Sequence, residues 1–396
     1  MKQEEVKRNI TLYKWHFSLV QSLFVGPILI LYLQKVGKMS LSHIYIMEAV
    51  VVLGFLLLEI PSGALADLIG RKKTIVLGSI LMIFSELALV IAVSPIYVWI
   101  SNIIWMISLS MRSGADSAFL YDSLKEVSRE DEYEEIQGKV MSYFFLSTAI
   151  CSLSVGFLSE ISLRLPFILS TIGILISCFL ALGFKEVPKN EKYSLERQKE
   201  LMKLSVLFVK NHKGIKWVIA FSTLLLASSK IWFFSYNPYF ELVKFDLRYY
   251  GAMFFLFNMV AWFFSKNAHI LKRRMGEQFS IVSMILLIAI PIILMATFVS
   301  KIMISMTVLQ NIVRGLRKPF VETFINRHIE DSERRATILS IRSAADGLVS
   351  FIALNLFGIA LRFWTLTFSL QVLGFSVLII GALLIVQYRK IFNVNK

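Results

Sequence analysis

Ionisable side chains inside long apolar segments are the residues of this 396-residue sequence that could do chemistry. Arg112 and Asp116 stand four positions apart in one such segment, and Arg342 and Asp346 repeat that spacing in another. Residues with this spacing lie on one face of a helix and can form an ion pair. A charge inserted into hydrocarbon costs roughly 2.5 kcal/mol or more, so each of these residues is either held by a partner or used for function.

The two aspartates are candidates for carrying protons. A carboxylate in apolar surroundings can hold a proton near neutral pH, because such surroundings disfavour its charged form. We therefore expect Asp116 and Asp346 to take part in proton coupling. The neighbouring arginines favour the charged form, so a purely structural ion pair in each segment stays an equal alternative.

Another group of candidates surrounds Lys230, which lies halfway along an apolar segment and next to the aromatic run that ends at Tyr236. A cation between aromatic side chains suits the wall of a substrate cavity, and the alternative is an ion pair with a carboxylate from another helix. The candidates for this cavity and for proton binding are Glu59, Arg112, Asp116, Lys230, Tyr236, Asn258, Arg314, Arg342 and Asp346.

The elements that position these residues are apolar segments of about twenty residues, the length that a helix needs to cross a hydrocarbon core of about 30 Å. Hydrophobic residues make up 56% of the chain and its mean hydropathy is +0.67. Spans must be helical, since lipid offers the backbone no hydrogen-bond partner. The sequence therefore predicts an all-α integral membrane protein with twelve transmembrane helices, at residues 15–33, 41–67, 74–93, 95–121, 140–161, 165–184, 217–240, 250–270, 279–299, 302–325, 336–360 and 364–386.

The distribution of basic residues sets the expected orientation, because cytoplasmic loops carry an excess of Lys and Arg. One set of alternate loops holds most of them, among others Arg71, Lys72, Lys73, Lys272, Arg273, Arg274, Arg334 and Arg335. The opposite loops hold Lys35, Lys38, Arg164, Lys244, Arg248, Lys301 and Arg362. We therefore expect a multi-pass protein of the plasma (inner) membrane with both termini in the cytoplasm.

A long polar segment divides the spans six and six. The predicted units are an N-terminal six-helix bundle (1–184), a cytoplasmic linker with an amphipathic helix near 194–210 (185–216) and a C-terminal six-helix bundle (217–396). Weak similarity between residues 113–122 and 314–323 supports an internal repeat, so the two bundles are expected to be pseudo-symmetric.

Composition also excludes several classes of protein. The net charge of +15 is spread over many short loops, which argues against a nucleic-acid-binding domain. The two cysteines lie inside apolar segments and indicate neither a disulfide framework nor a metal site. We expect no cofactor, no enzymatic activity and a monomer whose partners are the bilayer, a small-molecule substrate and protons.

The most distinctive local pattern joins the second and third expected spans, and it contains Gly63, Asp67, Gly70, Arg71 and Lys72. Gly63 would let a neighbouring helix approach closely, and Gly70 would allow a tight turn. Asp67 would place a carboxylate at the membrane edge, and the basic residues would anchor the loop. This pattern resembles the signature loop of the major facilitator superfamily, and the span count and the midpoint linker extend the resemblance over the chain.

The resemblance implies two bundles that rock about a central cavity. It also implies that Asp67 latches onto the positive N-terminal end of the eleventh span, near Ala336 and Thr337. Arg71 would bridge to a carboxylate at the cytoplasmic end of the fourth span, for which Asp122 is well placed. Asp67, Arg71 and Asp122 are thus expected to form a cytoplasmic gate.

The loop and the pair Gly26-Pro27 are similar to those of bacterial drug–proton antiporters. The first functional expectation is therefore proton-coupled efflux of hydrophobic, drug-like compounds by alternating access. Two features differ from that group: the fifth span has no proline, and Arg112 precedes Gly114 by two positions. The alternative is an uptake or exchange carrier in which the basic residues hold a small anionic metabolite.

Overall fold

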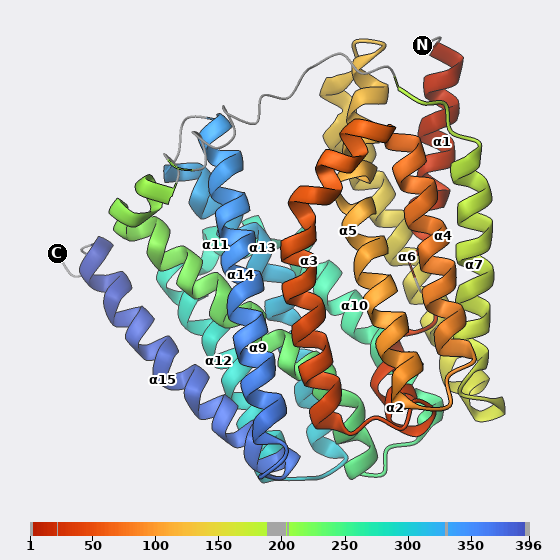
Figure 1. Ribbon diagram of the computed structural model, residues 1–396. Helices are drawn as coiled ribbons and strands as arrows, with labels where there is room; N and C mark the ends of the chain where they lie inside the picture. The colour runs from red at the N-terminus through yellow and green to blue at the C-terminus, as the bar shows by residue number, and fades with distance from the viewer. Residues whose placement is uncertain (1–2, 22, 188–202, 204–205, 329–331, 393–396) are drawn as a thin grey trace. The chain divides into compact units, whose positions relative to one another are not determined.

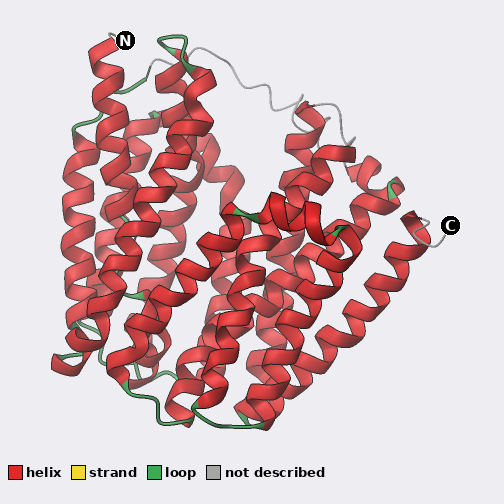
Figure 2. Cartoon of the chain, turned by 180° about the vertical axis from the view of Figure 1, so that it is seen from behind, coloured by secondary structure: helices red, strands yellow, loops and turns green. Residues whose placement is uncertain are grey.

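A computed structural model describes the chain except for residues 1–2, 22, 188–202, 204–205, 329–331 and 393–396. The described residues are almost entirely helical and contain no strand (Figure 2). Contacts divide the chain into two units. Unit 1 comprises Met1–Ser40, Leu53–Glu191 and Asp246–Phe255, and unit 2 comprises Leu41–Val52, Lys192–Phe245 and Leu256–Lys396. Most of the amphipathic helix expected near 194–210 lies outside the described residues.

The helices that begin before the linker are shown from red to yellow-green in Figure 1. They are α1 (Gln3–Leu19), α2 (Leu29–Lys35), α3 (Leu41–Ile69), α4 (Arg71–Val90), α5 (Pro95–Lys125), α6 (Tyr133–Ile161) and α7 (Leu165–Leu182). Within unit 1, α4 packs against α5 and α7, and α1 packs against α6 and α7. Tyr13, Phe119 and Phe184 lie in the apolar core between these helices, and none is more than 1% exposed.

The helices after the linker are α9 (Lys213–Leu242), α10 (Tyr250–Lys266), α11 (Ala268–Met275), α12 (Glu277–Thr297), α13 (Met306–His328), α14 (Ser332–Ala360) and α15 (Leu366–Phe392). Within unit 2, α9 packs against α13, α14 and α15, and α12 packs against α13 and α15. The beginning of α3 also belongs to unit 2, where the Tyr45 hydroxyl donates to the Ile231 carbonyl of α9 at 2.7 Å.

The first expected span is interrupted, contrary to the prediction of one helix over 15–33. Helix α1 ends at Leu19, and a short 3-10 turn over Gly26–Ile28 precedes α2. Pro27 has no backbone N–H to donate to the preceding turn, and Gly26 lacks helical preference. The Gly26-Pro27 pair therefore starts a new helix instead of continuing the old one.

Among the described residues, eight helices are long and apolar enough to cross a membrane. They cover the expected spans 2, 3, 5, 6, 7, 9, 11 and 12. The other four expected spans correspond to the interrupted α1–α2 pair, to α10 with its 17 residues, and to α5 and α13, which carry internal charges. Interruption, short length and internal charges set these four apart from the other eight, and the arrangement fits twelve spans.

Two glycines in unit 1 permit direct backbone contact between α6 and the beginning of α10. A Cβ at Gly251 would collide with the carbonyl oxygen of Ser152, and a Cβ at Gly156 would collide with that of Arg248. Backbones can approach this closely only where a side chain is absent. This explains why the segment Asp246–Phe255 belongs to unit 1.

Candidate functional site

The signature loop makes the tight turn between α3 and α4 that its glycine predicts. Gly70 has a φ of 102°, a conformation that favours glycine. Directly after the turn, the backbone N–H of Lys72 donates to Glu186 Oε1 at 3.1 Å. The Glu186 carboxylate thus accepts a hydrogen bond from the first turn of α4, where the helix dipole favours a negative charge.

Arg71 contacts two carboxylates in unit 1. Its Nη2 lies 3.0 Å from Asp67 Oδ1, and its Nε lies 3.5 Å from Asp122 Oδ2. The predicted bridge to Asp122 is therefore present. Burial at the end of α5 raises the pKa of Asp122, and the Arg71 guanidinium opposes this rise. The latch between Asp67 and Ala336 stays a prediction.

The surroundings of Gly63 do not test the role that the sequence predicts for it. No atom lies within 4 Å of the position that a Cβ would occupy, among the residues that the structure describes. The close helix contact expected at Gly63 stays a prediction. Glu59, one turn earlier, has an exposed side chain.

Arg112 and Asp116 form the predicted ion pair within α5. Arg112 Nη2 lies 3.1 Å from Asp116 Oδ2, and the side chains are 2% and 6% exposed. Gly78 of α4 provides the space, because a Cβ there would meet the Arg112 side chain. The pair is thus enclosed between α4 and α5.

His16 of α1 completes this buried group, and the sequence analysis missed it. Its Nε2 lies 3.9 Å from Asp116 Oδ1, and its Nδ1 contacts the Ser177 hydroxyl of α7 at 2.8 Å. His16 Nε2, Asp116 Oδ1 and Arg112 Nε have no hydrogen-bond partner among the described residues. A carboxylate and an imidazole that face each other with free polar atoms can share or exchange a proton.

His16 was not selected because the first span was expected to begin at residue 15, which would place His16 in its first turn. Helix α1 instead begins at Gln3, so His16 lies near its far end rather than at its first turn. The side chain is completely buried. A buried histidine opposite a carboxylate on another helix can only be recognised from tertiary structure.

Helix α13 presents a polar face in unit 2. Gln310, Arg314 and Arg317 follow helical spacing along it. Arg314 lies about 12 Å from the start of the helix, at a depth where a guanidinium avoids lipid. It lines a small pocket together with Gln310 and Asn311.

Neutral amides hold Arg314. Its Nη2 donates to Asn258 Oδ1 of α10, and its Nη1 donates to Asn311 Oδ1 at 3.2 Å. The structure therefore joins two predicted cavity residues, Asn258 and Arg314. No carboxylate lies within ion-pair distance of Arg314 among the described residues.

Asp346 pairs differently from the prediction. Its partner is Arg317 of α13, with Nη1–Oδ2 at 3.4 Å, and the Ser222 hydroxyl of α9 donates to Asp346 Oδ1 at 3.3 Å. The expected ion pair between Arg342 and Asp346 is wrong, because the carboxylate points to the neighbouring helices. Arg342 Nε and Nη1 have no hydrogen-bond partner among the described residues.

Lys230 of α9 faces a carboxylate that the sequence analysis did not select. Glu48 of α3 and Asp346 of α14 both attract its charge, and both lie in unit 2. Glu48 and Lys230 are each half-buried. Neither carboxylate lies within ion-pair distance of Lys230 among the described residues, so the ion pair of the alternative interpretation stays a prediction.

Aromatic side chains and amides line a small pocket beside Arg314. Tyr236 is 2% exposed and packs edge-on against Phe257 at a ring distance of 6.0 Å. Trp232 and Gln310 also line this pocket. Gln310 is 5% exposed, and neither polar atom of its amide has a hydrogen-bond partner among the described residues.

The charges in the interior of unit 2 do not cancel. Lys230, Arg317 and Arg342 are cations that interact with the carboxylates of Glu48 or Asp346, and Arg314 is a further cation that only amides hold among the described residues. Arg314 and Arg342 have no carboxylate within ion-pair distance in the described part of the chain. The region can therefore accept a negative charge. No cluster of three or more His, Cys, Asp or Glu side chains that could hold a metal was found among the described residues.

Comparisons with known proteins agree with this architecture. A family model described as Major Facilitator Superfamily matches residues 17–354. The uncharacterised MFS-type transporter YxaM of Bacillus subtilis (strain 168) is 22% identical over 361 residues, which is 87% of this chain and 88% of YxaM.

Solved structures of transporters align with this chain over almost its whole length. A bacterial homologue of the human lysosomal transporter Spinster aligns with a TM-score of 0.76 and 15% identity over 99% of both chains. The nucleoside transporter NupG aligns with a TM-score of 0.78 and 13% identity over 98% of this chain and 100% of NupG. At such identities the likeness shows a shared fold.

Proposed function

Because the chain belongs to the Major Facilitator Superfamily, we propose that it is a proton-coupled secondary transporter whose substrate is a small organic anion. Members of this family transport solutes and are not enzymes. The chain is a multi-pass membrane protein. Alternating access, a monomeric state and cytoplasmic termini in the plasma membrane belong to the same proposal.

The observation that carries the proposal is that two arginines of unit 2, Arg314 and Arg342, have no carboxylate within ion-pair distance among the described residues. Arg314 is held by two neutral amides, and Arg342 has two nitrogens without a hydrogen-bond partner among the described residues. Planar guanidinium groups bind carboxylates and phosphates with two parallel hydrogen bonds. An anionic substrate would neutralise these cations.

The aromatic pocket beside Arg314 adds a second requirement for the substrate. Tyr236, Phe257 and Trp232 offer apolar surface, and the amide of Gln310 offers a donor and an acceptor. A substrate whose anionic group meets Arg314 could place an apolar or planar part against these side chains. A purely hydrophobic cation would leave the guanidinium groups unpaired and would add a like charge.

Proton coupling is assigned to His16 and Asp116 in unit 1. Their facing atoms lie 3.9 Å apart and are free of other partners among the described residues. A proton bound here would neutralise Asp116 and leave Arg112 without its counter-ion. That change in charge inside a buried site can shift the preference between two conformations.

The experiment uses purified protein in proteoliposomes that contain a pH-sensitive dye. Small organic carboxylates and phosphates are added as one panel, and hydrophobic cations as a second panel. Proton movement with members of the first panel alone supports the proposal. Proton movement with the hydrophobic cations alone supports the efflux of drug-like compounds instead and contradicts the proposal.

A further inference from the structure

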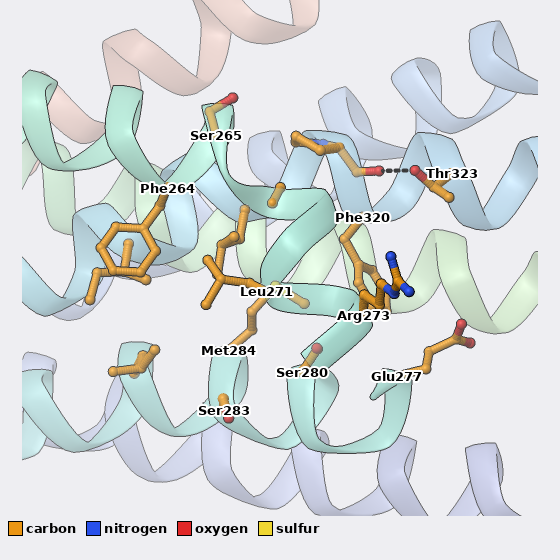
Figure 3. A pocket seen from close by; sticks show the side chains of 15 residues that line it. Phe264, Ser265, Leu271, Arg273, Glu277, Ser280, Ser283, Met284, Phe320 and Thr323 are labelled. Atoms are coloured by element: carbon orange, nitrogen blue, oxygen red, sulfur yellow. Dashed lines mark hydrogen bonds between the residues drawn. The ribbon is translucent and has the colours of Figure 1, made fainter. Parts of the chain in front are cut away.

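A second cavity lies in unit 2, apart from the polar face of α13. It has a volume of about 610 Å³ and lies where α10, α12 and α13 meet the short helix α11 (Figure 3). This volume falls in the range of roughly 300–1,000 Å³ that is usual for ligand pockets. The transport site does not use these residues.

The lining of the cavity is mostly apolar and carries its two charged side chains at one end. Phe264, Leu271 and Met284 lie on one side of the view in Figure 3 and toward its centre. Arg273 and Glu277 lie on the opposite side. An occupant with a hydrocarbon part and a charged end would match this arrangement.

The charged end of the cavity is basic. Arg273 and Arg274 of α11 both have exposed side chains. Glu277 is the acidic lining residue, and one of its oxygens accepts from the Tyr388 hydroxyl of α15 at 3.1 Å. Arg273 lines the cavity and Arg274 follows it in α11 outside the lining, so this basic helix brings a net positive charge to this end, which suits an anion.

The surroundings indicate that the occupant comes from the bilayer. Phe263, Ile270 and Phe279, which lie on the helices that form the cavity, have exposures of 53%, 41% and 57%. In a membrane protein, exposed apolar side chains of this kind face lipid. The basic helix α11, at the ends of α10 and α12, has the composition of a segment that lies at the membrane surface.

We propose that this cavity binds one anionic phospholipid. An acyl chain lies between Phe264, Leu271 and Met284, and the phosphate lies against Arg273. The bound lipid fastens α11 to α12 and α13, and thereby stabilises this end of unit 2. The site is independent of the transported substrate.

The test measures the thermal unfolding of detergent-solubilised protein during titration with phosphatidylglycerol or phosphatidylcholine. We expect phosphatidylglycerol to raise the unfolding temperature more than phosphatidylcholine, and native mass spectrometry to retain one copy of the lipid. Arg273→Gln loses most of this shift. Lys390→Gln, which removes an exposed cation at the end of α15, keeps it.

A cavity-filling variant and a titration with inorganic phosphate test whether the shift in unfolding temperature comes from a lipid in the cavity. Ser283→Phe fills the cavity and should abolish lipid retention while Arg273 is still present. Inorganic phosphate should give no shift, because it lacks the acyl chain. Equal shifts with both lipids, an equal shift with inorganic phosphate, or an unchanged response in Arg273→Gln would overturn the proposal.

Discussion

Arg317 of α13 forms an ion pair with Asp346 of α14, with Nη1 and Oδ2 at 3.4 Å, although Arg342 lies one helical turn from Asp346 in its own helix. The pair joins two helices, and Ser222 of α9 contacts both side chains. This arrangement determines which cations of unit 2 are neutralised. Arg342 is left without an ion-pair partner among the described residues and is available to bind the substrate.

Removal of one partner of this pair should destabilise the protein. Asp346→Asn leaves Arg317 as an uncompensated cation, which costs up to about 3 kcal/mol for a largely buried pair. The double variant with Arg317→Gln removes both charges and should recover much of that loss. Chemical or thermal unfolding of the purified variants measures the effect, and purely additive losses would show that the two residues are not coupled.

The His16–Asp116 contact predicts a separation of proton coupling from substrate movement. Asp116→Asn and His16→Gln should each abolish accumulation driven by a pH gradient, whereas exchange of substrate at equal pH continues. His43→Gln, which changes an exposed histidine of α3, is the matched control. Gradient-driven accumulation that survives in both buried variants would move the proton site elsewhere.

The charges around the signature loop predict a transport defect without a folding defect. Arg71→Ala removes the partner of both Asp67 and Asp122, and Asp67→Asn removes one of the carboxylates. Both variants should insert into the membrane normally and lose most transport activity. Lys73→Ala, which changes an exposed neighbour, should transport at the normal rate. Normal kinetics in Arg71→Ala and Asp67→Asn would refute a gate at this loop.

Two glycines should respond differently to the same substitution. A methyl group at Gly251 would collide with the backbone of α6, so Gly251→Ala should lower the yield of folded protein sharply. Gly63→Ala should be tolerated, because the space around Gly63 is open in the described structure. Yield and monodispersity after size-exclusion chromatography measure both. Loss of folding in Gly63→Ala, with a normal Gly251→Ala, would contradict the packing described above.

Local spacing explains what the sequence predicted correctly. Runs of apolar residues predict the helices. The glycine at position 70 predicts the tight turn, and the four-residue spacing of Arg112 and Asp116 predicts their ion pair. The partners of Asp346 and the carboxylates that attract Lys230 come from other helices, and spacing along the chain carries no information about them. Glu48 was missed although it is an ionisable residue inside an expected span, which is the criterion that selected the other candidates. The interruption at Gly26-Pro27 was visible in the sequence, but the surrounding hydropathy concealed it.

The central claim is that Arg314 binds the negative charge of the substrate, and the most direct measurement is the affinity of an organic anion that the transport assay identifies. A charged hydrogen bond contributes about 1.5–3 kcal/mol, so Arg314→Gln should weaken binding roughly tenfold or more. Arg314→Lys should retain part of the affinity, and Lys318→Gln, an exposed neighbour paired with Glu322, should bind normally. An affinity that is unchanged in Arg314→Gln would contradict the proposed anion site.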